Sequence, residues 1–306
     1  MAVQWPLLIF SVLLGASSGI MVFLGIGEAT GRFKAVRFPL ALVALVLLAL
    51  GGIASVFHLG HADRAFYILG NLNSGLSREL FAVGFLGVVT LVYMIVARKD
   101  YAGPAKVFGI LGLIGGAVLP LVAGSSLMMP ARPAWDSFTL PLMYLGTGLG
   151  LGFVLCAAYV LMKGAADDRR FAFQLAGVGI LCSIATSLFY IVWIAMAPFA
   201  DPTRSLARLA AGDLAVSFWL CVVLVGMVAP AALYFLVRKD ALDGDGAAEP
   251  AVAAVQADGS ATAAAGAAKL TAANALWVSL ACLVVGNVVL RVIMYAVATS
   301  VEHLIY

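Results

Sequence analysis

Residues 39–57 read PLALVALVLLALGGIASVF, a run of 19 residues without a charged side chain. A helix needs about 20 predominantly apolar residues to cross the hydrocarbon core of a bilayer, so this run predicts a membrane-spanning helix. The run leads into IASVFHLGHADRAFYILGNLNSGLSREL, residues 53–80, where titratable side chains concentrate before the next apolar span begins. The number of such spans decides the fold, and the polar segment between two of them is the first place to seek a function.

The composition extends this interpretation to the whole chain. The sequence is 64% hydrophobic and 11% charged, with a mean hydropathy of +1.09, which excludes an ordinary soluble domain. Long unbroken apolar runs are typical of helices, because barrel strands are short and alternate. The sequence therefore predicts an all-α, polytopic membrane protein with one domain over residues 1–306. The eight predicted spans are Trp5–Gly27, Pro39–Phe57, Leu80–Ala97, Ala105–Leu127, Phe138–Met162, Phe171–Ala197, Leu214–Val237 and Leu270–Ala298.

The distribution of Lys and Arg predicts the orientation. The odd-numbered connections hold 12 of these residues and the even-numbered ones hold 5. Because cytoplasmic loops are enriched in Lys and Arg, we expect both termini and residues 53–80 on the outer, periplasm-like face. No charge precedes Trp5, so the first span is expected to be a mature helix and not a signal peptide.

Small residues and connections give further expectations. Gly15 and Gly19, Gly112 and Gly116, and the glycines at 146, 148, 150 and 152 predict close helix contacts. Glu28 is expected to be a solvated flank. Residues 125–141 either dock a partner, cap a cavity or lie in the interface, and residues 203–213 fit a short amphipathic surface helix. Residues 240–269 lack large apolar side chains and predict a flexible cytoplasmic linker.

The polar segment holds the main candidate site. His58 follows the second span, His61 and Arg64 lie in the connection, and Glu79 begins the third span with Ser77 as a predicted N-cap. Each residue has a structural alternative: a capping histidine, a carboxylate that complements the helix dipole, or a snorkelling arginine. Residues 65–75 are too short to cross the membrane and fit an interfacial or re-entrant element.

The last span carries a second candidate. Asn287, Arg291 and Tyr295 are four residues apart and therefore share one helix face. An arginine inside a span needs an anionic partner or a polar cavity, so both a structural ion pair and a site role remain open.

The available side chains limit the chemistry. The four cysteines stand singly in spans, without C-x-x-C spacing, so we expect inert thiols, no metal site and no iron–sulfur cluster in this chain. The histidines lie at the outer ends of spans, where a haem held by two of them is not expected. A histidine and a carboxylate near an interface do suit quinol oxidation, which releases two protons with two electrons. Phe57, Phe66, Tyr67 and Phe81 are candidate walls for the ring, and the electron acceptor would be a cluster in another subunit.

Three blocks carry a family resemblance: WPLLIF at residues 5–10, GGIASVFHLG with RAF and LSREL over residues 51–80, and LRVIMY at residues 290–295. With them the chain resembles, along its whole length, the membrane-anchor subunits of dimethyl sulfoxide reductase-type enzymes (DmsC-like). The resemblance implies a bacterial inner-membrane anchor with a four-cluster iron–sulfur subunit and a molybdopterin catalytic subunit, holding Mo or W, on the periplasmic face.

The same resemblance implies menaquinol oxidation near the outer face for anaerobic reduction of a terminal acceptor. His58 and Glu79 match the family's functional histidine and acidic residue. We expect them to accept protons, while Arg64 and Arg291 shape the quinol pocket. No role is carried over to His61 or to the linker. The terminal substrate, such as a sulfoxide or an N-oxide, stays open.

Two alternatives remain from sequence. A secondary transporter or channel would be favoured by an internal repeat with paired broken helices at the membrane midplane, which the sequence does not reveal. The same anchor could also run in reverse, as the quinone-reducing subunit of a dehydrogenase.

Overall fold

The computed structural model describes residues 4–57, 74–196, 206–243 and 270–297. These residues form long helices, eight of which are long and apolar enough to cross a membrane. The helices are α1 (Trp5–Thr30), α2 (Arg37–Val56), α3 (Gly75–Arg98), α4 (Ala102–Ser125), α5 (Thr139–Lys163), α6 (Ala166–Met196), η2 (Ser217–Val228), α8 (Ala229–Asp243) and α9 (Ala272–Val297). The π-helix η2 and the first part of α8 together make one of the eight spans, Ser217–Lys239. The predicted polytopic all-α fold is confirmed, with each span ending within a few residues of the expected position.

The start of α3 differs from the prediction. Ser74, in an extended conformation, is the N-cap, and its hydroxyl oxygen accepts a hydrogen bond from the Ser77 backbone N–H at 3.1 Å. The expectation that Ser77 caps this helix is therefore wrong, because the chain already turns helical at Gly75. Glu79 consequently lies beyond the first helical turn, where its carboxyl is too deep to act as a simple partner of the helix dipole.

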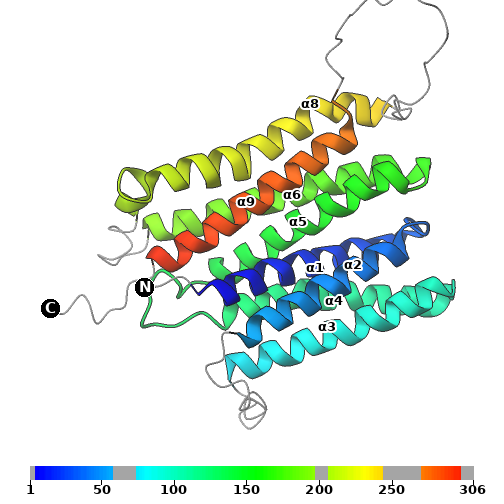
Figure 1. The fold of residues 1–306 in the computed structure, drawn as a ribbon, viewed down its shortest axis with the longest axis horizontal. Helices are drawn as coiled ribbons and strands as arrows, with labels where there is room; N and C mark the ends of the chain where they lie inside the picture. Colours follow the sequence, from blue (N-terminus) through cyan, green and yellow to red (C-terminus); the bar gives the residue numbers. More distant parts are fainter. Residues whose placement is uncertain (1–3, 58–73, 197–205, 244–269, 298–306) are drawn as a thin grey trace, which may run out of the picture.

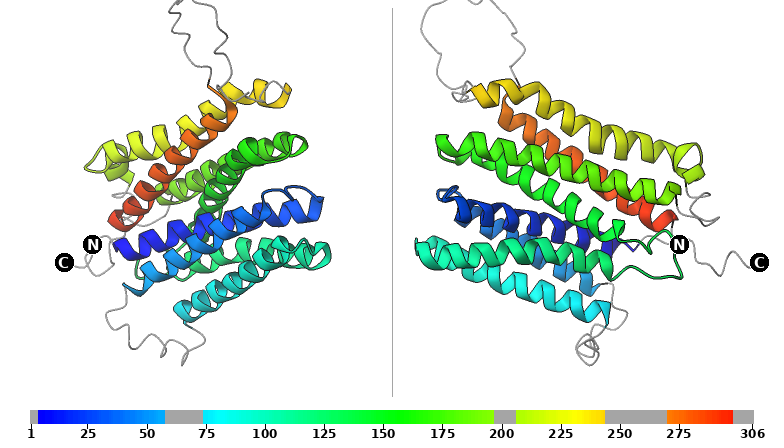
Figure 2. Two further views of the ribbon diagram at one scale, coloured as in Figure 1. Left: turned by 45° about the vertical axis from the view of Figure 1, so that its right-hand side comes forward. Right: turned by 180° about the vertical axis from the view of Figure 1, so that it is seen from behind.

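The helices form two groups of four (Figures 1 and 2). In the first group α1 packs on α2 and α4, and α3 packs on α2 and α4. In the second group α5 packs on α6 and α9, while η2 and α8 together pack on α6 and α9. The order of contacts is thus the same in both groups, a repetition that the sequence did not reveal. The groups meet where α1 and α4 contact α5.

Glycines make the contact between the two groups. A Cβ on Gly15 would lie 3.2 Å from the Cα of Gly148, and one on Gly19 would collide with the carbonyl group of Gly148. Gly152 faces Gly19 in the same manner. The predicted close contacts are confirmed, and they bring the α1 and α5 backbones together, as small residues do between helices in lipid.

The ends of the bundle have different compositions. The first residues of α1, α3 and α5 and the last of α2, α4, α6 and α9 lie together at one end, which we call the amino-terminal face (Figure 1). The connections α1–α2, α3–α4 and α5–α6 and the end of α8 lie at the other end, with the basic residues that predicted the orientation; we call it the basic face. The predicted side of the membrane for each face stays a prediction.

Two segments predicted to be connections, residues 203–213 and 240–269, are helical in part of the residues that the structure describes. Residues 206–210 are helical, in agreement with the short surface helix expected there. Arg208 donates to both carboxylate oxygens of Asp213, at 2.9 and 2.7 Å, and to the carbonyl oxygen of Ala296 at 2.9 Å. These bonds tie the connection to α9, and the guanidinium lowers the pKa of the exposed Asp213 carboxyl. In the predicted linker, α8 continues to Asp243, and residues 244–269 lie outside the described part.

Candidate functional site at the amino-terminal face

Glu79 is a buried carboxyl near the amino-terminal end of α3. Glu79 is 8% exposed, and among the described residues no Lys or Arg forms an ion pair with it. The Ser126 hydroxyl donates toward Glu79 Oε2 at 3.3 Å and toward the Ala123 carbonyl oxygen at 2.7 Å. One hydroxyl proton is therefore shared by two acceptors. A carboxyl held in this way inside a membrane span is a candidate for proton transfer.

Arg291 is a buried cation near the same end of α9. It is 2% exposed, and its guanidinium carbon lies 3.8 Å from the centroid of the Tyr144 ring. Its Nη2 donates to the Thr147 hydroxyl at 3.5 Å, whereas Nε and Nη1 have no hydrogen-bond partner among the described residues. Since a charge in a membrane interior is costly unless it is paired, these two free donors indicate a polar ligand or water at this position.

The two candidates belong to one neighbourhood. The hydroxyl groups of Tyr144 and Tyr295 lie within electrostatic range of both Arg291 and Glu79. Tyr144 comes from α5 and Tyr295 from α9, so helices of both groups contribute to it. We call these four residues the Glu79–Arg291 cluster. The expectation of a simple structural ion pair for Arg291 is not met within the described residues, because the carboxyl in range is not in contact with it.

The connection between α4 and α5 covers this cluster. Trp135 is 2% exposed, donates from Nε1 to the Met294 carbonyl oxygen at 3.0 Å and meets the Tyr295 ring edge-on at 5.4 Å between centroids. The guanidinium carbon of Arg132 lies over the Trp135 ring, 4.6 Å from its centroid. Residues 125–141 were expected to dock a partner, to cap a cavity or to lie in the interface. Trp135 fits the second of these, because its side chain is directed into the bundle and not outward to a partner.

The other predicted site residues fall in two classes. His58, Arg64 and Tyr67, with His61 and Phe66, lie outside the described residues, so their predicted roles stay predictions. Phe57 is 78% exposed at the end of α2 and Phe81 is 52% exposed on α3. Neither ring lines a cavity with Glu79 in the described part of the chain. The structure therefore brings Glu79 and Arg291 into one neighbourhood and leaves Phe57 and Phe81 on the surface.

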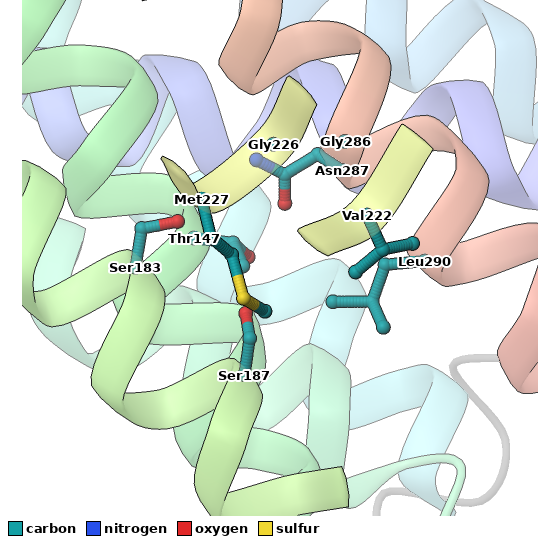
Figure 3. A pocket seen from close by; sticks show the side chains of 9 residues that line it. All are labelled: Thr147, Ser183, Ser187, Val222, Gly226, Met227, Gly286, Asn287 and Leu290. Atoms are coloured by element: carbon teal, nitrogen blue, oxygen red, sulfur yellow. The ribbon is translucent and has the colours of Figure 1, made fainter. Parts of the chain in front are cut away.

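A small polar cavity beside Arg291 was not predicted. It holds about 10 Å³, room for a single water molecule, and its polar lining comes from Thr147, Ser183, Ser187 and Asn287 (Figure 3). Thr147 is also the residue that accepts from Arg291, so the cavity adjoins the Glu79–Arg291 cluster. The sequence signal that could have found it is the four-residue spacing of Asn287 and Arg291.

The π-helix η2 forms another wall of this cavity. Val222, Gly226 and Met227 of η2 line it together with Gly286 of α9. Gly226 and Gly286 touch backbone to backbone, since a Cβ on Gly226 would lie 2.7 Å from the Gly286 Cα. The Ala229 N–H bonds to the Leu224 carbonyl in the π spacing, and Pro230, which has no N–H to donate, follows directly in the same continuous span. π-helical turns are frequent at functional sites.

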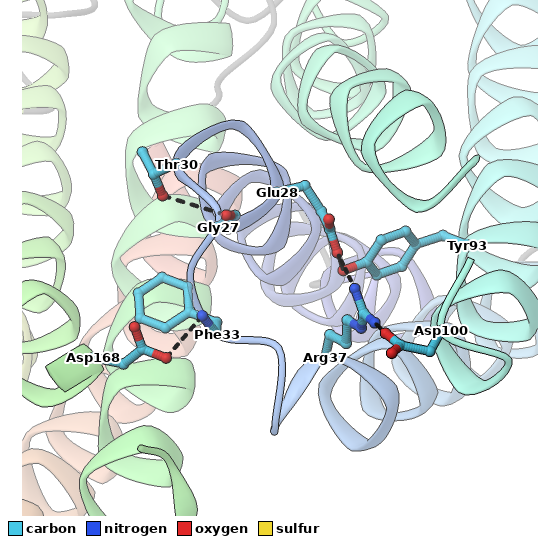
Figure 4. A network of polar contacts seen from close by, with 8 residues as sticks. All are labelled: Gly27, Glu28, Thr30, Phe33, Arg37, Tyr93, Asp100 and Asp168. Carbon is cyan, nitrogen blue, oxygen red and sulfur yellow. Dashed lines mark hydrogen bonds and ion pairs between the residues drawn. The ribbon is translucent and has the colours of Figure 1, made fainter. Parts of the chain in front are cut away.

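A second polar cluster, at the basic face, has a structural role. Glu28 accepts from Arg37 at 3.3 Å and from the Tyr93 hydroxyl at 2.9 Å, and Arg37 also pairs with Asp100 (Figure 4). The expectation of a solvated Glu28 is wrong, because side chains from α2 and α3 enclose it. Asp168 of α6 accepts from the Phe33 backbone N–H at 2.9 Å in the same region. These bonds join the α1–α2 connection to α3 and α6.

Comparison with known proteins gives consistent similarities. A sequence model of the family described as "DMSO reductase anchor subunit (DmsC)" matches residues 1–200. The chain is 31% identical over 165 residues to the YnfH subunit of an anaerobic dimethyl sulfoxide reductase of Escherichia coli, a match that spans 51% of this sequence and 57% of that one. It is 27% identical over 198 residues to the C subunit of the anaerobic dimethyl sulfoxide reductase of Haemophilus influenzae, a match that spans 62% and 69% respectively.

These matches have definite limits. The aligned part spans little more than half the length of the Escherichia coli subunit. The family match contains the segment 53–80 and Tyr144, whereas η2, α8 and α9 with Arg291 lie beyond residue 200. The similarity expected along the whole length is therefore supported for residues 1–200, and a role for Arg291 rests on the geometry alone.

Proposed function

The chain belongs to the family of dimethyl sulfoxide reductase anchor subunits, and on that basis we propose that it anchors a molybdopterin oxidoreductase in the membrane and supplies it with electrons from menaquinol. The proposed partners are an iron–sulfur subunit and a molybdopterin catalytic subunit at the amino-terminal face. The membrane is proposed to be the bacterial inner membrane, with this face toward the periplasm.

The Glu79–Arg291 cluster is the observation that carries this proposal. Quinol oxidation releases two protons and two electrons, so the site needs proton acceptors and groups that hold the ring oxygens. Glu79 is a buried carboxyl without an ion pair in the described part of the chain, and Arg291 has two donors free there. We assign proton acceptance to Glu79 and to His58, which follows Phe57 in the sequence, and binding of a quinol oxygen to Arg291. Arg64 is assigned to the same pocket.

Electrons leave through a partner. The proposed path runs directly from the quinol to an iron–sulfur cluster of the partner subunit. The position of the Glu79–Arg291 cluster near the amino-terminal face keeps that path short. Protons released at the same face would leave without crossing the membrane.

Purification tests the anchor role. The protein should copurify in mild detergent with two larger soluble subunits, with iron, and with molybdenum or tungsten. Its recovery alone and free of metal would contradict the assembly and favour the transporter. Paired broken helices would also favour the transporter, but η2 is the one departure from α-helix among the described spans.

Loss of His58 tests the site. A His58→Ala variant should lose menaquinol-dependent reduction of the terminal acceptor while keeping activity with an artificial donor that feeds the catalytic subunit directly. Equal activity with menaquinol would remove His58 from the site. A complex that catalyses the reverse reaction faster, from its substrate to quinone, would show that the anchor serves a dehydrogenase.

A further inference from the structure

A groove opens on the membrane side of the bundle at the basic face, far along the helices from the Glu79–Arg291 cluster. It lies between the first turns of α2 and the last turns of α3 and has a volume of about 560 Å³. Its lining residues are Phe38, Leu42, Met94, Ile95, Arg98 and Lys99. The volume lies within the range of sites that hold small molecules.

The inner part of the groove is apolar and faces the bilayer. Leu42 is 43% exposed and Ile95 is 45% exposed, although both lie in helices that cross the membrane. In the most apolar stretch of each of these two spans 28% is buried within the protein, and further apolar side chains, such as Val46 and Val88, are exposed. An acyl chain along Leu42, Met94 and Ile95 would therefore have apolar contact from two helices.

The outer part of the groove is cationic. The guanidinium carbon of Arg98 lies over the Phe38 ring, 5.2 Å from its centroid. In the described part of the protein neither Arg98 nor Lys99 forms an ion pair. The neighbouring carboxylate, Asp100, is bound to Arg37. Two cations thus lie at the mouth of an apolar groove without an anion.

The depth of these cations matches a lipid phosphate. Arg98 ends α3, and the backbone turns at Asp100, with φ of 56°, before α4 begins at Ala102. Tyr101 in this turn is 54% exposed, as is usual for tyrosines at the level of lipid headgroups. Ile95 lies three residues before Arg98, about 4.5 Å deeper along the helix. Along α3 the cationic side chains therefore lie at the end of the helix and the apolar ones deeper, which matches the phosphate and the acyl chains of a phospholipid.

We propose that this groove binds one acidic diacyl phospholipid. Arg98 and Lys99 hold its phosphate, and Leu42, Met94 and Ile95 hold the upper part of an acyl chain. Basic pockets between membrane-spanning helices bind anionic headgroups by this combination. Arg98 lies over the Phe38 ring, and a guanidinium can donate to two phosphate oxygens at once, which suits it to bind the phosphate.

Native mass spectrometry of the protein purified with its subunits tests this proposal. Phosphatidylglycerol and phosphatidylethanolamine, which differ in headgroup charge, are added in equal amounts, and the lipid retained by the protein is identified. We expect one tightly held phosphatidylglycerol. In the double variant Arg98→Gln/Lys99→Gln its affinity should fall about thirtyfold, since each cation near an anionic lipid contributes roughly a fivefold factor.

Matched variants separate this site from general charge. Arg238→Gln/Lys239→Gln removes a similar exposed pair at the basic face and should leave the retained lipid unchanged. Leu42→Trp fills the groove without changing charge and should release the lipid. Inorganic phosphate alone should not compete, because it lacks the acyl chain. Equal retention of both lipids by the unaltered protein, retention of menaquinone in their place, or undiminished binding in the Arg98 and Lys99 variant would each overturn the proposal.

Discussion

The guanidinium carbon of Arg291 lies 3.8 Å from the centre of the Tyr144 ring, and this contact compensates part of its charge inside the protein. A cation over an aromatic ring gains roughly 0.5–2 kcal/mol, much less than burial of a charge costs. Among the described residues the Thr147 hydroxyl is the one hydrogen-bond partner of this guanidinium. Retention of such an incompletely paired cation is the pattern expected where a ligand completes the site.

Replacement of Arg291 by Met should therefore have opposite effects on stability and on turnover. Removal of a poorly paired buried charge stabilises proteins by about 1–4 kcal/mol when an apolar side chain of similar volume replaces it. Loss of the free donors should lower menaquinol-dependent turnover by about tenfold or more, the value of a hydrogen bond from a charged group. Thermal unfolding and the quinol-linked assay, run on one preparation, measure both.

Arg132→Met is the control for that experiment. Arg132 also lies over an aromatic ring, that of Trp135 in the connection between α4 and α5. Its replacement should change the free energy of unfolding by less than about 1 kcal/mol and lower quinol turnover far less than Arg291→Met does, because its ring contact is with Trp135 and not with Tyr144. A destabilised Arg291→Met with normal quinol kinetics would instead assign Arg291 a purely structural role.

Glu79→Gln should slow menaquinol oxidation by roughly 10²- to 10³-fold, within the range attributed to a positioned proton acceptor. The amide keeps the size of the side chain and can still bond to Ser126, so the packing of α3 on α4 is preserved. Activity with an artificial donor to the catalytic subunit should be unchanged. Ser126→Ala should give a smaller loss, because it removes a single hydrogen bond to the carboxyl.

The exposed carboxylate Asp136 offers the comparison for Glu79. It lies at the same face in the connection between α4 and α5. Asp136→Asn should leave quinol turnover at the level of the unaltered protein. Equal losses in both variants would point to a general effect of negative charge at this face, and no loss in Glu79→Gln would exclude Glu79 as the acceptor.

Gly19→Ala should destabilise the protein by about 1–3 kcal/mol, the usual cost of inserting a methyl group where no space exists. Its Cβ would collide with the backbone of Gly148, and a backbone cannot move aside as a side chain can. Gly84→Ala is the matched control in α3, since a Cβ there meets no atom within 4 Å. Gly84→Ala should stabilise the helix by roughly 0.5–1 kcal/mol. Denaturant titration in mixed micelles compares the two.

The features that could be predicted from the sequence are those that depend on the composition of a long stretch of residues. Eight spans follow from unbroken apolar length, and the contact of Gly15 and Gly19 with another helix follows from their spacing. Glu79 and Arg291 could be singled out because ionisable groups inside spans are rare. Their common neighbourhood could not be predicted, because α3 packs on α4, α4 on α5 and α5 on α9, and no local pattern encodes that arrangement.

Other features were missed for similar reasons. Whether Glu28 is solvated depends on Arg37 and Tyr93, which lie on other helices. The π-helix η2 arises where Gly226 meets Gly286 across the bundle, a contact between residues far apart in the sequence. Serine is a good N-cap residue, so both Ser74 and Ser77 were candidates. Which of them caps α3 is decided by the hydrogen bond from the Ser77 backbone N–H to the Ser74 hydroxyl oxygen, which residue type alone does not predict.

The buried pair of Glu28 and Arg37 leads to the last prediction. Both side chains are nearly inaccessible, at 10% and 6% exposure, and Tyr93 adds a third partner. Arg37→Met should destabilise the protein by about 3–5 kcal/mol, because it leaves the Glu28 carboxylate buried without its cation. The double variant Arg37→Met/Glu28→Gln should recover most of this loss, since no buried charge is then left unpaired; Asp100, the other partner of Arg37, is 84% exposed. Arg32→Met breaks the ion pair with Asp168, in which Arg32 is 41% exposed, and should cost less than about 1 kcal/mol. If the double variant were as unstable as Arg37→Met alone, the packing of Arg37, and not its charge, would hold α2 against α1 and α3.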